Sequence, residues 1–515
     1  MIANRIITNT AFNAVGRVWL ILVNFLLTPL ILSYLGDQRF ALWALFWTFS
    51  TWFSFMDLGV GVSVVREVAR LAEEESVKEL NTTLFSALAF NFLMGLLILL
   101  VAWSIADGLV TMMHVRDALR SDALAVAYLG PLVFMLMGLM GIFDCFLRGM
   151  QRYDLIVIVS ISASLINVLT VWSVLHFGYG ILGLMIAVTL VYLVQLAILV
   201  GFSVHVFPKL AFRPAYISVK RIRQMLPFGL HLQTAQLAEL ASYQADKIIL
   251  AVLTPLYFVT TYDLGAKVAS LLRQIPYLLT SAIFPVISQL HANGDTVRLW
   301  MIYERGSKYL WMVSTPLFVG LCITAPFVIQ LWLGYVSPDV YYAVIVLSFG
   351  FWSTVNVSVA YNVGTGMGWS KPVMYISLIQ AVSNLLLSWL LASSLGYVGV
   401  LYATSMTLMV TSGLVYLRFC RDFNRARRLD VNLFMRVLWA NLAPAVACLA
   451  YLYFGGHWGV PESRVAAIAP LLICVGTYML LYLIAIRIIG LLDSSDLEWL
   501  GGYCPVILRK YLFVK

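Results

Sequence analysis

The chain has 515 residues, of which 62% are hydrophobic and only 11% are Asp, Glu, Lys or Arg, with a formal net charge of +9. Soluble domains carry about 25% charged residues, so this composition excludes an ordinary soluble enzyme. Apolar stretches of about 18 or more residues recur along the whole length, which predicts an all-α polytopic membrane protein. The basic residues lie in loops between these stretches, which argues against nucleic acid as a partner.

The hydropathy pattern predicts 14 transmembrane helices, and the eighth is long enough that it is expected to kink or break near Pro276 and Pro285. In chain order the predicted helices cover residues 11–35, 40–62, 82–106, 122–147, 155–177, 180–206, 225–253, 257–290, 309–333, 341–365, 372–394, 396–420, 434–455 and 465–491. The charged stretch Arg66–Leu80 after the second helix is interpreted either as an amphipathic interfacial helix or as a solvated connector.

The distribution of Lys and Arg predicts the orientation of these helices. With the N-terminus inside, 25 of the 33 basic residues fall in cytoplasmic segments, four fall outside and four lie within helices. This bias predicts an even number of spans and two cytoplasmic termini. The outer loops are too short to hold the catalytic carboxylates of a membrane transferase, so we expect no enzyme and no catalytic residues.

An internal repeat relates two parts of the chain, as is common in transporters. The matching segments are Gly149–Trp172 with Gly366–Trp389, and Gly180-x-x-Gly183-x-x-x-Ala187 with Gly396-x-x-Gly399-x-x-x-Ala403. The match places helices 5 and 6 on helices 11 and 12, so helices 1–6 and 7–12 are predicted to form two repeats. The predicted organisation is an N-lobe at 1–206, a cytoplasmic linker at 207–224, a C-lobe at 225–420, two additional helices at 421–491 and a cytoplasmic tail at 492–515.

Polar side chains inside the predicted helices are the candidate functional residues, because a charge at the bilayer centre costs at least about 2.5–3.5 kcal/mol. Helices 1 and 7 each carry a polar stripe on one face. Its members are Thr10, Asn13, Arg17, Asn24 and Thr28 in helix 1, and Gln233, Gln236, Glu239, Tyr243, Asp246 and Lys247 in helix 7. Because these helices open the two repeats, a central cavity between the lobes is the simplest interpretation.

Helix 8 adds Asp263 and Lys267 at i,i+4, followed by Arg273. The first two can form an ion pair on one face, which is also the purely structural explanation for their presence. Asp57 in helix 2 is interpreted either as a partner of Arg17 or as a protonatable group. The excess of cations inside the helices predicts a cavity that attracts anions rather than cations.

Four parts of the sequence carry motifs that occur in a known family of proteins. They are Asn13-x-x-Gly16-Arg17 with Pro29–Leu32, Phe55–Gly59, Leu147–Arg152, and Asp246–Leu250 with Tyr262-x-x-Gly265-Ala266-Lys267. These segments resemble the polysaccharide transporter family, the Wzx-like flippases of the multidrug/oligosaccharidyl-lipid/polysaccharide exporter superfamily. The resemblance implies two six-helix lobes in a V and alternating access. It also implies that the protein carries a polyprenyl-pyrophosphate-linked oligosaccharide across the bacterial cytoplasmic membrane, for O-antigen, capsule or exopolysaccharide synthesis.

Two alternatives from the same superfamily stay open, an ion-coupled drug or cation exporter and a flippase for the peptidoglycan lipid precursor. The expected partners are the lipid-linked oligosaccharide, membrane lipids, and the polysaccharide polymerase with its chain-length machinery. No cofactor and no metal site are expected, and H⁺ or Na⁺ is left open as a coupling ion.

The resemblance also implies roles for individual residues. Substrate binding is assigned to Arg17, Lys247, Lys267, Arg273, Asn13, Asn24, Gln236 and Tyr243. Coupling or switching is assigned to Asp57, Asp246, Asp263 and Glu239, and a cytoplasmic gate to Arg148 and Arg152. An ion pair between Asp144 and Arg148, which are also spaced i,i+4, is the structural alternative to the gate.

Overall fold

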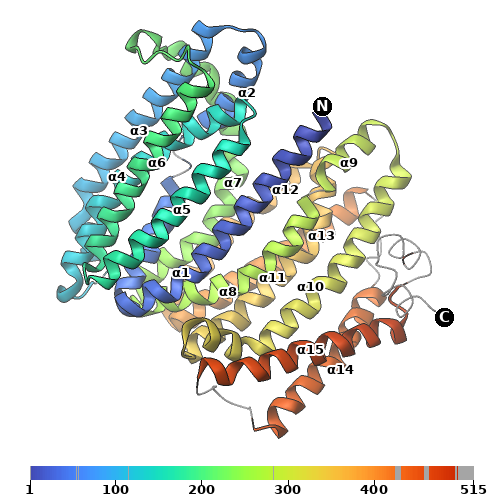
Figure 1. Ribbon diagram of the computed structural model, residues 1–515. Coiled ribbons are helices and arrows are strands. Elements are labelled where there is room, and N and C mark those ends of the chain that lie inside the picture. The colour runs from blue at the N-terminus through green and yellow to red at the C-terminus, as the bar shows by residue number, and fades with distance from the viewer. Residues whose placement is uncertain are drawn as a thin grey trace. The chain divides into compact units, whose positions relative to one another are not determined.

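The computed structural model describes residues 2–53, 55, 57–113, 115–281, 283–423, 431–456, 463–492 and 496. Within these ranges, the side chains of residues 2–15, 17, 228–239, 241, 275–279, 281, 284–285 and 431 are not among the described ones. The described residues form fifteen α-helices and one 3-10 helix, and no strand occurs among them (Figure 1). The all-helical prediction is therefore confirmed.

These helices follow one another along the described chain. They are α1 Ile2–Phe53, α2 Val60–Glu73, α3 Val77–Met112, α4 Asp117–Gly149, α5 Tyr153–His176, α6 Gly180–Val206, η1 Pro214–Tyr216, α7 Val219–Leu253, α8 Tyr257–Ser281, α9 Ile283–Ala292, α10 Thr296–Leu333, α11 Pro338–Gly366, α12 Ser370–Leu395, α13 Tyr397–Phe423, α14 Val431–Phe454 and α15 Arg464–Ile489.

Eleven described helical segments are long and apolar enough to cross a membrane, so the chain is a multi-pass membrane protein. Helices α7 and α8 are not among the eleven, and they carry the charged residues Asp246, Lys247, Asp263, Lys267 and Arg273. Helix α1 holds two of the predicted spans in one element. The count of 14 spans stays a prediction.

The first two predicted spans meet at a break inside α1. Gly36 lies there with φ 71° and ψ 169°, a conformation that side chains with a Cβ rarely adopt. The Thr260 hydroxyl of α8 donates a hydrogen bond of 2.5 Å to the carbonyl of the next residue, Asp37. The break in α1 thus lies where a glycine permits an unusual backbone conformation and where a side chain of α8 contacts the next residue.

The end of the second predicted helix, at residue 62, is wrong. Helix α1 ends at Phe53, and a turn with Leu58 (φ 50°) and Gly59 (φ 75°) precedes α2. The carboxylate of Asp57 accepts hydrogen bonds from the backbone N–H groups of Gly59 (2.9 Å) and Gly61 (3.1 Å). These bonds satisfy donors at the start of α2 that have no partner within the helix, which explains the new helix at this point.

The charged stretch Arg66–Leu80 is not one helix, so the interfacial-helix interpretation is wrong in its extent. Its first part completes α2, the chain turns at residues 74–76, and α3 begins at Val77. The long eighth predicted helix corresponds to α8 and α9, and residue 282 between them lies outside the described residues, so the expected break stays a prediction.

The chain divides into two compact units. The first comprises Met1–Asp263 with Gln380–Val400, and the second comprises Leu264–Ile379 with Leu401–Lys515. The core of the first unit lies among α2 to α6 and includes Val64, Leu84 and Phe146. The core of the second is built by α10, α14 and α15, with Met312, Cys448 and Tyr482 among its members. The predicted lobe boundaries stay a prediction.

The glycines of the internal repeat adopt matching geometry. Gly180 has φ 59° and Gly396 has φ 60°, each at the turn before a helix. A Cβ on Gly183 would lie 2.4 Å from the Cβ of Tyr179, and one on Gly399 would lie 2.1 Å from the carbonyl oxygen of Leu391. The repeated glycines therefore build the same tight helix-to-helix connection in two places.

Candidate functional site

Among the predicted site residues whose side chains are described, the most buried carboxylate is Asp246 on α7, which has 0% of its surface exposed. Its Oδ2 accepts a hydrogen bond of 2.6 Å from the Tyr262 hydroxyl of α8. Its Oδ1 accepts hydrogen bonds from Ser388 Oγ (2.9 Å) and Asn384 Nδ2 (3.2 Å) of α12. Three neutral donors thus take the place of the water that burial removes from this group.

The α12 contribution follows from its sequence. Asn384 and Ser388 are spaced i,i+4 in α12, so both lie on one helix face. Asn384 Nδ2 also donates a hydrogen bond of 2.9 Å to the carbonyl oxygen of Ser242 on α7. Polar groups of this kind hold helices together in a membrane because lipid offers them no alternative partner.

A buried ion pair lies beside Asp246. Lys247 Nζ is 2.6 Å from Asp263 Oδ1, and the two side chains are only 11% and 6% exposed. The i,i+4 spacing predicted Lys267 as the partner of Asp263, whereas the structure adds Lys247 of the preceding helix. A buried pair contributes little net stability, but losing one member leaves an uncompensated charge. A ligand that draws Lys247 away would therefore leave the buried Asp263 carboxylate without the charge of this lysine.

Lys267 and Arg273 belong to the second compact unit. Lys267 is half-buried on α8, and the guanidinium carbon of Arg273 lies 5.5 Å from the centroid of the Phe351 ring on α11. The electrons of an aromatic face attract a cation at this distance, so the contact helps to orient Arg273 within its own unit.

The polar stripe predicted for helix 1 is described only in part. Asn24 is exposed, and its Nδ2 donates a hydrogen bond of 2.9 Å to the carbonyl oxygen of Leu20 in the same helix. Tyr243 is half-buried on α7. The side chains of Asn13, Arg17, Gln236 and Glu239 lie outside the described side chains, so their predicted roles stay predictions.

The two arginines assigned to a gate are both paired with carboxylates close by in sequence. Arg148 Nε lies 2.8 Å from Asp144 Oδ2, which confirms the ion pair expected from their spacing. Arg152 contacts both oxygens of Asp154, at 3.0 and 2.8 Å. The side chains of Arg148 and Arg152 are 43% and 41% exposed, so these pairs are solvated. The gate role itself stays a prediction.

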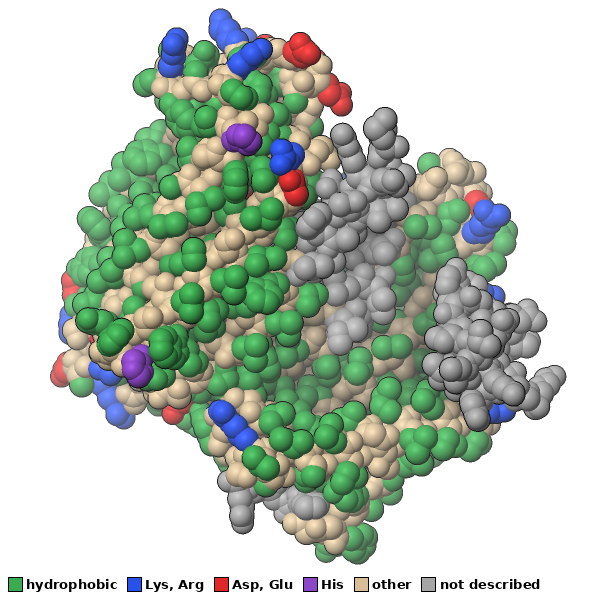
Figure 2. Space-filling view, viewed as in Figure 1, with side chains coloured by type: hydrophobic (Ala, Val, Ile, Leu, Met, Phe, Trp, Pro, Cys, Tyr) green, Lys and Arg blue, Asp and Glu red, His purple; other side chains and the backbone are tan. Residues whose placement is uncertain are grey.

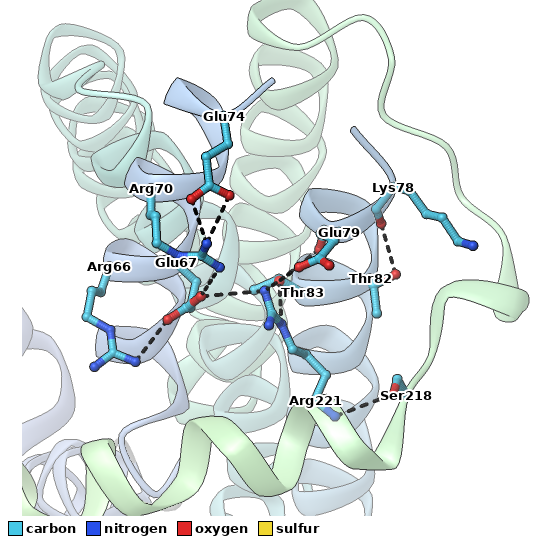
Figure 3. Close-up of polar contacts among 10 residues, drawn as sticks. All are labelled: Arg66, Glu67, Arg70, Glu74, Lys78, Glu79, Thr82, Thr83, Ser218 and Arg221. Atoms are coloured by element: carbon cyan, nitrogen blue, oxygen red, sulfur yellow. Dashed lines mark hydrogen bonds and ion pairs between the residues drawn. The ribbon is translucent and has the colours of Figure 1, made fainter. Parts of the chain in front are cut away.

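A second cluster of charges was not predicted from the sequence. It joins α2, α3 and α7, and we call it the α2–α3–α7 cluster. Its members are Arg66, Glu67, Arg70, Glu74, Glu79, Thr83 and Arg221 (Figure 3). Arg221 donates a hydrogen bond of 2.9 Å to Thr83 Oγ1, and its guanidinium lies 3.5 Å from Glu67 and 3.6 Å from Glu79. This residue connects the start of α7 to helices more than 130 residues earlier in the chain.

Glu67 is the acceptor at the centre of this cluster. Arg66 and Arg70 donate hydrogen bonds to its two oxygens at 2.9 and 3.0 Å. Partial burial alone would raise the pKa of Glu67, but these hydrogen bonds and the charge of Arg221 outweigh it and lower the pKa below its usual value. Glu67 is therefore ionised at neutral pH.

The sequence predicted no site role for Asn384 or Ser388, and Tyr262 was predicted only as part of a motif. The i,i+4 spacing of Asn384 and Ser388 places both side chains on one face of α12 and is the sequence feature that could have identified them. Among the described residues, no group of three or more His, Cys, Asp or Glu side chains is placed to hold a metal ion.

Residues 6–291 match the profile of a family described as polysaccharide biosynthesis protein, and this range is more than half of the chain. The chain belongs to this family. A curated relative is an uncharacterized membrane protein of Methanocaldococcus jannaschii, 25% identical over 214 residues. The match covers 41% of this chain and 42% of that relative, so the chain matches less than half of its length.

Two solved structures show which fold this polysaccharide biosynthesis family member adopts. A multidrug resistance MATE family transporter of the MOP superfamily, in an inward-facing conformation, is 16% identical, with a TM-score of 0.67 over 79% of this chain and 96% of that one. The lipid II flippase MurJ, in an inward closed conformation, is 14% identical, with a TM-score of 0.67 over 93% of this chain and 99% of that one. The family member thus has the fold of MOP-superfamily transporters, as the motifs led us to expect.

Proposed function

We propose that this protein is a flippase that carries a polyprenyl-pyrophosphate-linked oligosaccharide across the bacterial cytoplasmic membrane by alternating access. Both termini face the cytoplasm in this proposal, and the protein performs no covalent chemistry. The observation that supports it most is a Lys–Asp pair buried in the helices of a membrane protein of the polysaccharide biosynthesis family. Ionisable groups at such positions are costly and mark substrate or ion pathways.

Lys247 is the proposed contact for the pyrophosphate. Without substrate, its ammonium is held 2.6 Å from the Asp263 carboxylate. A pyrophosphate brings at least two negative charges and several acceptor oxygens, so it competes for the ammonium through charge-assisted hydrogen bonds. The lipid tail stays in the bilayer throughout. Binding then replaces the carboxylate partner of Lys247 with a phosphate. This replacement shifts the equilibrium between the conformations of the helices that carry Lys247 and Asp263.

Asp246 is the proposed coupling group. When both carboxylates are ionised, Asp246, Lys247 and Asp263 carry a net charge of −1, which one H⁺ or Na⁺ would cancel. The hydroxyl and amide donors on Asp246 come from α8 and α12, so a change in its charge acts on three helices at once. An ion that neutralises Asp246 would therefore shift the conformational equilibrium of the same helices that the substrate affects.

The test is transport in vesicles that contain the purified full chain and a fluorescent polyprenyl-pyrophosphate oligosaccharide. Lys247→Gln should slow translocation about 10- to 100-fold, because it removes charge-assisted hydrogen bonds worth about 1.5–3 kcal/mol. The matched control is Lys371→Gln, which removes an exposed lysine at the start of α12 and should leave the rate unchanged. An unchanged rate in Lys247→Gln, at equal protein content, would refute the assignment.

The same vesicles distinguish the alternatives. Since the similarity to the MATE transporter and to MurJ has the same TM-score of 0.67, the fold favours neither substrate. Uptake of cationic drugs in exchange for Na⁺ or H⁺, without movement of the oligosaccharide, would replace the proposal with a drug exporter. Movement of the peptidoglycan lipid precursor alone would replace it with a flippase for that lipid.

A further inference from the structure

The segment that joins α6 to α7 is fixed along one side to α3. We call residues 207–223, which include the first residues of α7, the linker segment. Asn81 of α3 accepts a hydrogen bond from the Ala211 N–H (2.9 Å) and donates one to the Lys209 carbonyl oxygen (3.1 Å). Farther along α3, Ser86 Oγ accepts a hydrogen bond of 2.9 Å from the Ser218 N–H. Side chains of α3 therefore hold the linker backbone at both ends.

Two further contacts complete this attachment. Leu210 is buried in the core of the first unit, and Arg221 binds Thr83 and Glu67 in the α2–α3–α7 cluster (Figure 3). The linker segment is thus an ordered element with one side against the protein. Its other side is exposed.

The exposed side of the linker segment carries both hydrophobic and basic side chains. Phe212, Ile217 and Val219 are 55%, 48% and 73% exposed. Between and around them, four basic side chains are also exposed, namely Lys209, Arg213, Lys220 and Arg223. Apolar and basic residues mixed in this way are typical of segments that lie in a membrane interface.

The four cations differ from other basic residues of the first unit. Arg66, Arg70, Arg148 and Arg152 each face a carboxylate at 2.7–3.0 Å. Across the part of the chain that the structure describes, none of Lys209, Arg213, Lys220 and Arg223 takes part in an ion pair. Their charges are left available to an anionic partner from outside the chain.

The linker segment lies next to the ends of two candidate membrane spans. It begins directly after α6, which ends at Val206, and then runs alongside the first turns of α3, which begins at Val77 (Figure 1). From Asn81 to Ser86 it descends about 7.5 Å along α3, since a helix rises 1.5 Å per residue. Charged and hydrophobic side chains lie side by side at this end of the unit (Figure 2).

We propose that the linker segment is a lipid-docking surface that binds the anionic headgroups of phospholipids in the adjacent leaflet. Phe212, Ile217 and Val219 lie at the boundary of headgroups and acyl chains, and the four unpaired cations contact phosphates. A lipid partner is favoured because the surface is continuous with the spans α3 and α6. An acidic protein partner would explain the cations, but it would not require the apolar groups to lie beside a membrane span.

The first test is a titration of the detergent-solubilised full chain with phosphatidylglycerol or with phosphatidylcholine, read as the rise in Tm. Wild type should respond at a lower concentration of the anionic lipid than of the zwitterionic lipid. Arg213→Gln/Lys220→Gln should need about 25-fold more phosphatidylglycerol, at roughly fivefold for each charge removed. Its response to phosphatidylcholine should stay unchanged.

The matched control is Arg66→Gln/Arg70→Gln, which removes two exposed cations of the same unit that already face carboxylates. Its midpoint for phosphatidylglycerol should shift far less than that of the linker variant. Equal shifts in the two variants would show that only the net charge of the protein matters, and this would overturn the proposed site.

The second test locates the apolar side chains in vesicles that contain phosphatidylglycerol. A nitroxide attached to Phe212→Cys should collide more often with oxygen, which is lipid-soluble, than with a water-soluble nickel chelate. The control is Asp295→Cys at the start of α10, where the chelate should prevail. Access of the chelate to position 212 in vesicles, combined with protection in native membranes, would identify a protein occupant and refute the lipid proposal.

Discussion

The buried polar group on α7, α8 and α12 and the α2–α3–α7 cluster use the same chemistry in opposite surroundings. Lys247 and Asp263 are 11% and 6% exposed, whereas Arg66 and Arg70 are 51% and 48% exposed around a Glu67 side chain that is 14% exposed. Their ion-pair distances are similar, between 2.6 and 3.0 Å. Water screens the exposed pairs, which are worth about 0–1 kcal/mol, while loss of one buried partner costs about 3–5 kcal/mol. Exposure, rather than distance, decides how much each pair matters.

Helix α7 carries both kinds of site. Arg221 lies in its first turn and Lys247 in its last two turns, about 39 Å apart at 1.5 Å per residue. At the first end Arg221 is 16% exposed and its partners Glu67 and Glu79 are 14% and 58% exposed, so water reaches these charges in part. The other end is held by the Lys247–Asp263 pair and by Asp246, which is fully buried. A difference in response to mutation, salt and pH between these two ends is therefore expected along a single helix.

The largest effect is expected from Asp263→Asn, which leaves the Lys247 ammonium with a neutral partner at a buried position. The free energy of unfolding should fall by about 3–5 kcal/mol. Denaturant unfolding of the purified chain in detergent, monitored by circular dichroism, measures this loss.

The control for this variant replaces the pair with apolar residues. Lys247→Met/Asp263→Leu removes both charges and should restore stability close to the wild-type value or above it. It should not restore transport if Lys247 binds the substrate. A double variant that stays as unstable as the single one would contradict the buried-pair explanation.

A smaller loss is expected from Asn384→Ala. The change removes hydrogen bonds to Asp246 and to the carbonyl oxygen of Ser242, so the free energy of unfolding should fall by about 1–3 kcal/mol. Asn167→Ala is the matched control, because the internal repeat places Asn167 at the equivalent position and the structure shows it only half-buried. Equal losses in the two variants, measured by the same unfolding curves, would argue against a special role of the Asp246 group.

Arg221→Ala should cost about 1 kcal/mol, because it removes a charge-assisted hydrogen bond and two ion pairs that are only partly buried. Raising the salt concentration should reduce the difference from wild type. Lys78→Ala, an exposed neighbour in the same figure, should leave stability unchanged (Figure 3). Thermal unfolding at low and high salt checks all three statements, and a loss independent of salt would indicate a packing role for Arg221 instead.

The smallest effect is a dependence on pH through Glu67. Because its pKa in the folded chain is lowered from the usual value of 4.5, its contribution to stability is present above pH 4.5 and is lost as the pH falls through the lowered pKa. The difference in Tm between wild type and Glu67→Gln should therefore be present at pH 7 and shrink in acid. A difference that grows on acidification would reverse the sign of this argument.

Much of the fold could be predicted from the apolar stretches. The predicted helix 180–206 coincides with α6. The error at residues 40–62 arose because Leu58 and Gly59 turn the chain within a sequence that is apolar on both sides. Hydropathy does not register a change of backbone direction that leaves the composition unchanged.

The sequence by itself determined which residues bring charge into the membrane helices, because length and hydropathy are properties of a continuous stretch of chain. It therefore identified Asp246, Lys247 and Asp263 as candidates. Only the tertiary structure decided that Asn384 and Ser388, more than 130 residues later, hydrogen-bond to Asp246, and that Lys247 pairs with Asp263. Such pairings depend on which faces of distant helices pack together, and the spacing of residues within one helix carries no information on that choice.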